Sequence, residues 1–331
     1  MQRGRIGLVV VLMLREAGEW VLVTALLLST RTVALTWHGD VEKYTSAWCQ
    51  HNHRTNQPRV VLYNRLPKSG STTMTKIIAD QLARDRTLQG WPVEERFWSD
   101  RVMRFGLRDE FAAELRKHLA KRSIRMLIAS GHFHLDPDQP RKAFRASFER
   151  IQLFRACEER VKSRIRYDLP SARVGRRANP TQEARLEASA ADRLERACLQ
   201  NVTCFKNSWN GSHTREALRF TAASSASAAT TNLLQHYAAF GFIEQLEETL
   251  LLLKCVLPRI FMNARIPADK SNANARTVEW TEAVTRDIQS SCREEDEFLS
   301  NVREVFAALV RRVKLDPKGC CRQPPEWTKG K

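Results

Sequence analysis

Lys68 lies in a short segment whose residue types suit the binding of a phosphate group. The residues that follow it are hydroxyl side chains and one glycine, namely Ser69, Gly70, Ser71, Thr72 and Thr73. A lysine ammonium group and hydroxyl donors stabilise a phosphate through charge-assisted and ordinary hydrogen bonds. An ordinary connection with a solvated lysine is the alternative, and the composition of the segment does not decide between the two.

The flanking residues predict a strand, a tight loop and a helix around this segment. Residues 60–63 are a β-branched and aromatic run, which is typical of a buried strand. Pro67 and Gly70 break the run, and Ser71 or Thr72 can cap a helix with one apolar face, formed by Met74, Ile77, Ile78 and Leu82. The first amides of a helix have no internal partners, and the helix dipole favours negative charge there. The pattern therefore predicts an anion site at the start of this helix.

The order of the residues excludes one large class of phosphate loop. Nucleotide hydrolases need the pattern Gly-x-x-x-x-Gly-Lys-Ser/Thr, with the lysine directly after the second glycine. Here Lys68 precedes Gly70, and no glycine lies at the required earlier position. An ATPase or GTPase loop is therefore not expected.

The stretch Tyr63-Asn-Arg-Leu-Pro-Lys-Ser-Gly-Ser-Thr72 resembles the 5′-phosphosulfate loop of Golgi sulfotransferases. It is similar in particular to the uronosyl 2-O-sulfotransferases of heparan and dermatan sulfate, which open their domain with Tyr-Asn-Arg-Val-Pro-Lys-Thr. The resemblance implies a single α/β domain with a central parallel sheet flanked by helices. It implies 3′-phosphoadenosine 5′-phosphosulfate (PAPS) as the sulfate donor, and no metal. It also implies that Lys68 and the loop from Ser69 to Thr73 hold the donor, and that Arg65 contacts the acceptor.

His132 directly follows Gly131, just after a second predicted strand at residues 124–128. Parallel α/β sheets place catalytic groups at the carboxyl ends of their strands, and a histidine is the usual general base for a hydroxyl group. His134 would share a face with His132 on an extended segment, and a pair of surface histidines is the alternative. The 2-O-sulfotransferases carry Gly-His at this point, which implies that His132 is the base. Their heparan member has another histidine two residues earlier, where this chain has Ser130.

Arg155 ends a third predicted strand, which begins at residue 151, and a helix is expected directly after it. Its guanidinium can bind a phosphate through two hydrogen bonds at once, which a lysine cannot. The family sequence Ile-Asn-Val-Ile-Arg-Asp-Pro-Ile-Glu-Arg-Leu-Val-Ser is similar to this stretch, which keeps in register Arg155, Glu159, Arg160, Val161 and Ser163. The resemblance implies that Arg155 and Ser163 hold the 3′-phosphate of the donor. The family's Asp-Pro is Ala156-Cys157 here, and a proline would have fixed the first helical turn.

The resemblance continues in the second half of the chain. A strand at 240–243, a helix at 244–257 and a terminal helix at 294–313 follow the family's order of elements. Residues 168–230 give no clear pattern of helices or strands. Three further residues fall where the family closes a basic loop over the donor, namely Lys270, Ser271 and Arg276.

The charge of the chain indicates an acidic polymer as its partner. With 54 lysines and arginines against 37 acidic residues, the formal net charge is +17 and the pI is about 9.9. Such a charge suits nucleic acid, an anionic membrane or an acidic polysaccharide. The resemblance favours a glycosaminoglycan, with heparan sulfate ahead of dermatan or chondroitin sulfate, and sulfate transfer to the 2-hydroxyl of its uronic acid. It also implies a homo-oligomer, because the heparan enzymes of the family are trimeric.

A catalytically weakened family member that binds acidic polysaccharide is the alternative to an enzyme. Two departures from the family pattern motivate it. The family's acceptor-facing tyrosine falls at Ala79, and its Asp-Pro is replaced by Ala156-Cys157. Binding of the donor distinguishes the two hypotheses.

Cysteines and glycosylation sequons indicate the secretory pathway. The eight cysteines include no Cys-x-x-Cys pair, so a structural zinc site is not expected, and their even number is compatible with disulfides. Cys198 and Cys204 flank a loop that is short enough to close. Sequons begin at Asn201 and Asn210. A nucleic-acid-binding protein would require these features to be accidental, so nucleic acid is not expected as a partner.

Four segments are expected along the chain. Residues 1–36 are an apolar leader interrupted by charges, which we expect to be a membrane signal-anchor, with a cleaved signal peptide as the alternative. Residues 37–58 are polar and are expected to form a stem, residues 59–314 the sulfotransferase-type domain, and residues 315–331 a C-terminal tail. This order predicts a single-pass type II protein of the Golgi membrane with a lumenal catalytic domain.

Overall fold

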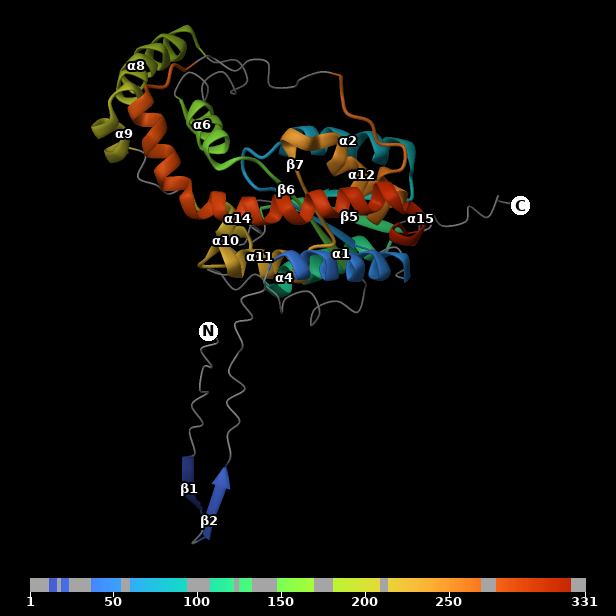
Figure 1. The fold of residues 1–331 in the computed structure, drawn as a ribbon. Coiled ribbons are helices and arrows are strands. Elements are labelled where there is room, and N and C mark those ends of the chain that lie inside the picture. Colours follow the sequence, from blue (N-terminus) through green and yellow to red (C-terminus); the bar gives the residue numbers. More distant parts are fainter. Residues whose placement is uncertain are drawn as a thin grey trace.

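The computed structural model describes residues 12–16, 19–23, 37–54, 60–93, 108–121, 125–132, 148–169, 181–208, 214–268 and 278–322. At their centre lies a five-stranded sheet (Figure 1) in which every pair of neighbouring strands is parallel. Its strand order is β4-β5-β3-β6-β7, with bounds β3 Val60–Asn64, β4 Leu88–Pro92, β5 Met126–Gly131, β6 Phe148–Phe154 and β7 Ala239–Phe242. The predicted α/β fold with a central parallel sheet flanked by helices is confirmed.

The winding of the sheet reverses between β3 and β6. From β3 the chain passes to β4 and β5 on one side, whereas from β6 it continues to β7 on the other side. Asn64 at the end of β3 pairs with Gly131 of β5 and with Gln152 of β6, so the carboxyl ends of these strands lie along one edge. In open parallel sheets, ligands bind in the crevice at such a switch point.

Helices pack on both faces of the sheet (Figure 1). Successive side chains of β3 point alternately to the two faces of the sheet. Val61 and Tyr63 join the larger core with helix α2, whereas Val60 and Leu62 pack in a smaller cluster with Leu115 of helix α4. The helices are α1 Trp37–Arg54, α2 Ser71–Arg84, α4 Arg108–Leu119, α6 Cys157–Asp168, α8 Gln182–Gln200, α9 Val202–Ser208, α10 Glu216–Phe220, α11 Ala226–His236, α12 Leu246–Val256, α13 Pro258–Phe261, α14 Glu282–Leu315 and α15 Pro317–Cys320, with a 3-10 turn η2 at Ile243–Gln245.

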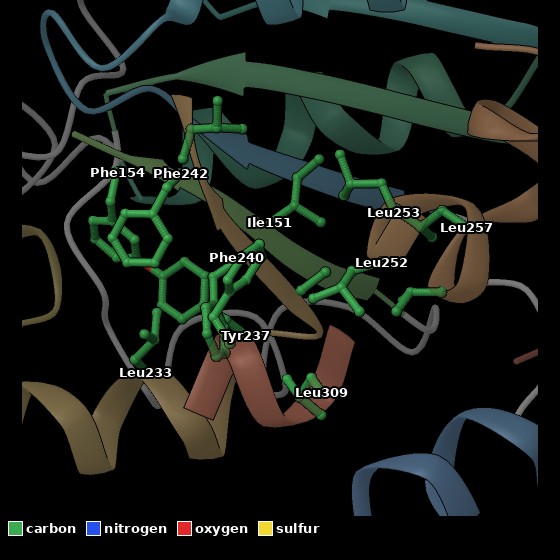
Figure 2. Close-up of a cluster of buried hydrophobic side chains, with 14 of the residues drawn as sticks. Ile151, Phe154, Leu233, Tyr237, Phe240, Phe242, Leu252, Leu253, Leu257 and Leu309 are labelled. Atoms are coloured by element: carbon green, nitrogen blue, oxygen red, sulfur yellow. The ribbon is translucent and has the colours of Figure 1, made fainter. Parts of the chain in front are cut away.

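The larger core fills the space between β6, β7 and the helices α11, α12 and α14 (Figure 2). Phe154 of β6 lies edge-on to Phe298 of α14, with ring centroids 5.5 Å apart, and Phe242 of β7 lies edge-on to Phe306 at the same distance. Such edge-to-face pairs add to the free energy of apolar burial. The end of β6, from which Arg155 follows, is therefore held by rigid packing.

Residues 37–54 differ from the expected stem. They form helix α1, whose Val41, Trp48 and Cys49 are buried in the larger core. The indole Nε1 of Trp48 donates a hydrogen bond of 2.9 Å to the carbonyl oxygen of Ala238, next to β7. The helix is thus part of the domain, because one buried stripe suffices to anchor a helix whose other faces are polar.

The start of the expected C-terminal tail is likewise part of the domain. α14 begins at Glu282, earlier than the predicted 294, and ends at Leu315. After α15, the guanidinium of Arg322 is buried and pairs with the carboxylate of Glu149 on β6. Residues 315–322 are therefore fixed to the sheet.

All eight cysteines form disulfides, as their even number suggested. Cys198 and Cys204, which flank a loop short enough to close, do form a pair, and the other pairs are Cys49–Cys320, Cys157–Cys292 and Cys255–Cys321. Two of the bonds start from neighbouring cysteines and attach the end of the chain to α1 and to α12. These two disulfides close loops of 271 and 66 residues, which restricts the unfolded chain and so stabilises the fold.

The described part of the expected leader is a two-stranded antiparallel ribbon. β1 Leu12–Glu16 pairs with β2 Glu19–Val23, with Arg15 opposite Trp20. Among the described residues, no helix is long and apolar enough to cross a membrane. Residues 1–11, 17–18 and 24–36 of this segment lie outside the described residues, and the signal-anchor stays a prediction.

Candidate functional site

The loop between β3 and α2 has the backbone of an anion-binding turn. Gly70, which precedes α2, has φ 77°, and Lys68 has φ 61°, a left-handed conformation that is uncommon for a residue other than glycine. Gly70 has no side chain that could cap α2, and the first hydrogen bond of the helix runs from the Met74 amide to the Gly70 carbonyl at 3.1 Å. The amides of residues 71–73 therefore precede the helical ladder, where backbone N–H groups bind anions.

Ser69 adds a second indication of a ligand in this loop. Its side chain is 1% exposed, and its Oγ has no hydrogen-bond partner among the described residues. A buried hydroxyl without a partner costs about 1–3 kcal/mol, so such a group calls for a partner that the described residues do not supply. A phosphate oxygen in the loop would accept its hydrogen bond.

Gly70 is required at its position for two physical reasons. A Cβ there would lie 2.4 Å from the Cδ1 of Ile243, and the residue has a positive φ. Gly70→Ala is expected to lower the free energy of unfolding by about 1–3 kcal/mol, which urea denaturation measures. Gly90→Ala is the matched control. Among the described residues, its Cβ would meet the end of the flexible Leu82 side chain, at 2.6 Å, and Gly90 has no positive φ. A loss for Gly70→Ala no larger than that of the control would contradict this account.

Arg155 lies against the same loop. It follows β6, and its Nη1 donates a hydrogen bond of 3.4 Å to the carbonyl oxygen of Lys68, while its Nη2 forms an ion pair of 3.4 Å with Glu159. The structure therefore brings together the two loops that the sequence analysis singled out. Ser163 lies two turns further along α6, since an α-helix has about 3.6 residues per turn.

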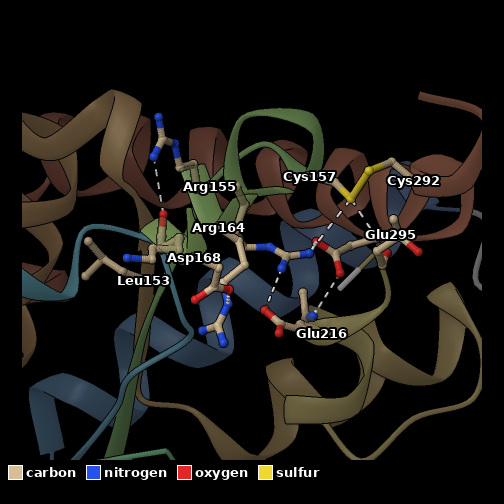
Figure 3. A network of polar contacts seen from close by, with 12 residues as sticks. Leu153, Arg155, Cys157, Arg164, Asp168, Glu216, Cys292 and Glu295 are labelled. Atoms are coloured by element: carbon tan, nitrogen blue, oxygen red, sulfur yellow. Dashed lines mark hydrogen bonds and ion pairs between the residues drawn. A yellow bond between two sulfur atoms is a disulfide. The ribbon is translucent and has the colours of Figure 1, made fainter. Parts of the chain in front are cut away.

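Three contacts hold the first turn of α6, and Figure 3 shows the Cys157–Cys292 disulfide among them, together with the carboxylates of Glu216 and Glu295. Glu244 accepts a hydrogen bond of 3.0 Å from the amide of Ala156, and Cys157 forms a disulfide with Cys292 of α14. One turn later, Arg160 is wholly buried between two carboxylates. The helix begins at Cys157, where the family pattern has proline, so these contacts hold the turn that a proline would otherwise have restricted.

The side chain of Lys68 also lies against α6. Its Nζ is 2.9 Å from the centroid of the Tyr167 ring, which is the geometry of a cation–π contact. Tyr167 is four residues after Ser163, so the two share one face of the helix. Arg155 and Tyr167 thus contact the loop from the side of α6, and Ser163 lies on the same face of that helix as Tyr167.

His132 lies directly after β5, beside Arg65. The backbone amide of Arg65 donates a hydrogen bond of 2.8 Å to the carbonyl oxygen of Gly131, and the ring of Phe220 lies edge-on to the imidazole at 6.2 Å. Burial, and then the charge of Arg65, lower the pKa of His132 from 6.5 to about 4, while a hydrogen bond with the Arg65 backbone and the charge of Glu216 oppose this shift. The imidazole is therefore neutral at physiological pH and able to accept a proton.

Arg65 is placed to meet a ligand next to the histidine. Its Nε is buried and has no hydrogen-bond partner among the described residues. A guanidinium N–H that lacks a partner is suited to an anionic group of a ligand. Arg65 and His132, from neighbouring strand ends, thus present a cation and a neutral base side by side.

Three contacts of the site were not anticipated from the sequence. Glu244, Glu216 and Tyr167 lie 88, 56 and 99 residues from the residues they contact, namely Ala156, Arg160 and Lys68. Of the three, only Tyr167 could have been assigned to the site from the sequence, because it lies one turn after Ser163 on a predicted helix. His134, Lys270, Ser271 and Arg276 lie outside the described residues, and the described part holds no group of three or more His, Cys, Asp and Glu residues that would suit a metal.

Comparisons with known proteins do not assign this site. No protein-family model matches the chain, and no curated protein matches it. The residues and their arrangement therefore carry the functional inference.

Proposed function

We propose that this protein is a sulfotransferase that moves sulfate from PAPS to the 2-hydroxyl of a uronic acid in a glycosaminoglycan. The observation that carries the proposal is the meeting of two loops at the switch point of the sheet, where Arg155 donates to the carbonyl of Lys68. A left-handed turn, free helix amides and the buried Ser69 hydroxyl lie in the same place. This set fits a ligand with two separate phosphate groups, because one loop offers lysine and amides and the other offers arginine.

Each residue of the site has a role in the proposed reaction. PAPS supplies an activated sulfuryl group, whose bond from sulfur to the 5′-phosphate oxygen breaks as the acceptor oxygen bonds to sulfur, leaving adenosine 3′,5′-bisphosphate. His132 takes the proton from the acceptor hydroxyl. Lys68 and the loop from Ser69 to Thr73 stabilise the negative charge that develops on the departing phosphate. Arg155 and Ser163 hold the 3′-phosphate.

The acceptor is argued from charge. The net charge of +17 favours a polyanion, and Arg65 beside His132 suits the carboxylate of a uronic acid. The four disulfides are compatible with an oxidising compartment. We propose the Golgi lumen as its compartment, with heparan sulfate as the first acceptor to test and dermatan or chondroitin sulfate as the others.

The proposal is tested by transfer of labelled sulfate from PAPS to desulfated heparin and to dermatan in parallel, together with calorimetry of adenosine 3′,5′-bisphosphate. Lys68→Ala is expected to weaken binding of the bisphosphate by about 10- to 150-fold, because a hydrogen bond to a charged group contributes about 1.5–3 kcal/mol. Lys76→Ala, on an exposed position of the same helix α2, is the matched control and should leave the affinity unchanged.

The outcomes separate the two hypotheses for this chain. Transfer that is lost in Lys68→Ala and kept in Lys76→Ala supports the enzyme, and the preferred acceptor names the substrate. Absence of both transfer and bisphosphate binding overturns the proposal. Salt-dependent binding to heparin would then remain as the property of an acidic-polysaccharide-binding protein.

A further inference from the structure

The contact between Lys68 and Tyr167 links the β3–α2 loop to helix α6. The Nζ of Lys68 lies 2.9 Å from the centroid of the Tyr167 ring, while the Lys68 carbonyl accepts a hydrogen bond of 3.4 Å from Arg155. Both the backbone and the side chain of this lysine are thus held from the side of α6. Its left-handed backbone, with φ 61°, is part of the same arrangement.

The ring of Tyr167 is not a core side chain. It is 41% exposed, in contrast to Val161 and Ile165 of the same helix, which are buried at 4% and 0%. A large aromatic side chain that stays half exposed and lies under a cation gains little from apolar burial. The face of a tyrosine ring attracts an ammonium group through its quadrupole, and the attraction is stronger where water is partly excluded.

We propose that Tyr167 is a positioning residue for Lys68: its ring holds the ammonium group at the mouth of the phosphate loop before the donor binds. This inference rests on the proposed function. A lysine side chain has four rotatable bonds, and ordering it on binding weakens the affinity for a phosphate. A ring that orders the side chain beforehand removes part of that loss. Because Tyr167 shares a face of α6 with Ser163, the lysine is held on the side where the donor is proposed to lie.

The first test examines the contact itself and does not depend on the function. In the full chain labelled with ¹³C-lysine, the methylene protons next to the Lys68 ammonium should resonate at unusually low frequency, because they lie over an aromatic face. The signal is identified by its loss in Lys68→Ala. Tyr167→Leu should return it to the ordinary lysine position, and Tyr167→Phe should keep it shifted. An ordinary lysine position in the unsubstituted chain would overturn the proposal.

The second test examines whether the contact acts on phosphate binding. Affinity for adenosine 3′,5′-bisphosphate is measured by calorimetry for Tyr167→Leu and for Tyr167→Phe. It is also measured for Lys68→Ala alone and for the double variant of Lys68→Ala with Tyr167→Leu. We expect Tyr167→Leu to weaken binding about fivefold to tenfold, in line with a cation–π contact at a partly exposed site, and Tyr167→Phe to stay within about twofold. With alanine at position 68, Tyr167→Leu should have no further effect. Leu186→Ala, at an exposed apolar side chain of α8, serves as the control for general changes of the surface.

The two tests distinguish failure of the inference from failure of the proposed function. If the unsubstituted chain does not bind the bisphosphate, the proposed function is overturned, and the positioning role with it. If Lys68→Ala weakens binding and Tyr167→Leu does not, the positioning role alone is overturned. A loss on Tyr167→Leu that persists in the Lys68→Ala background also overturns it, because the ring would then act on the ligand or the fold without the lysine.

Discussion

Replacement of His132 by asparagine is expected to lower kcat for sulfate transfer by about 10²- to 10⁴-fold, the usual contribution of a positioned general base. Asparagine keeps a polar side chain of similar size, but it has no basic nitrogen. Affinity for adenosine 3′,5′-bisphosphate should stay within about twofold, because the histidine follows β5, whereas Lys68 and Arg155, the proposed ligands of the two phosphates, follow β3 and β6. Initial rates with PAPS and desulfated heparin measure the first effect, and calorimetry measures the second.

The pH dependence of the unsubstituted enzyme follows from the same residue. Burial and the charge of Arg65 lower the pKa of His132 to about 4, so the imidazole is already the neutral, proton-accepting form at pH 6 to 8. The value of kcat/KM should therefore not fall through pH 6.5, where an ordinary histidine becomes protonated, but only as the pH approaches 4. The residual activity of His132→Asn should lack this acid limb.

His118→Asn is the matched control for this experiment. The pKa of His118 is also lowered by burial, but its Nδ1 lies 2.8 Å from the Nε2 of Gln89 on the edge strand β4. Its substitution should leave both the rate and the pH profile of transfer unchanged. Equal losses in the two variants, or full activity in His132→Asn, would contradict the assignment of His132 as the base.

The strands that position the site could be predicted because they are buried on both faces. β3 is a continuous apolar run that ends before the turn residues Pro67 and Gly70, and the second half of β6 carries Ile151, Leu153 and Phe154 directly before Arg155. β4 was missed for a physical reason. It is an edge strand that contains Gly90 and Pro92, and only Leu88 and Trp91 are buried in it, so the apolar run that marks a strand is absent.

Contacts between distant segments could not be predicted in the same way. The short Cys198–Cys204 loop was visible from spacing, but Cys49 and Cys320 are 271 residues apart. Helix α1 was interpreted as a stem because its buried side chains are few and lie among histidines, asparagines and charges. Pairing of such segments is decided by the packed tertiary structure, which no local pattern contains.

Arg160 is expected to be the most important charged side chain for the stability of the fold. It is 0% exposed, its Nη1 lies 2.6 Å from Glu216, and its Nη2 lies 2.6 Å from Glu295, which is also 0% exposed (Figure 3). The second carboxylate oxygen of Glu295 accepts a hydrogen bond of 2.9 Å from the amide of Ala217. Arg160→Met removes the cation that pairs with Glu216 and with the buried carboxylate of Glu295, which costs about 3–5 kcal/mol of unfolding free energy.

A matched pair of variants makes this prediction specific. Arg286→Met breaks an ion pair of 3.6 Å with Glu282 whose side chains are 70% and 84% exposed, and such pairs contribute at most about 1 kcal/mol. The double variant of Arg160→Met with Glu295→Leu should recover part of the stability that Arg160→Met loses, because apolar groups can replace a buried ion pair at little cost. Denaturant unfolding measures all three. If Arg160→Met and Arg286→Met lost equal amounts of unfolding free energy, burial would not govern the contribution of Arg160 to stability.

The stability lost in Arg160→Met should also depend on pH with a defined sign. Burial raises the pKa of Glu295, and the charge of Arg160 opposes this rise, so removal of Arg160 raises the pKa further. A carboxyl group with a higher pKa in the folded state binds more protons there than in the unfolded chain, so its unfavourable contribution grows as pH rises above the unfolded value of about 4.3. The deficit of Arg160→Met should therefore be smaller at pH 5 than at pH 8, whereas that of Arg286→Met should not change. A deficit independent of pH would mean that lost packing, and not the unpaired carboxylate, destabilises the variant.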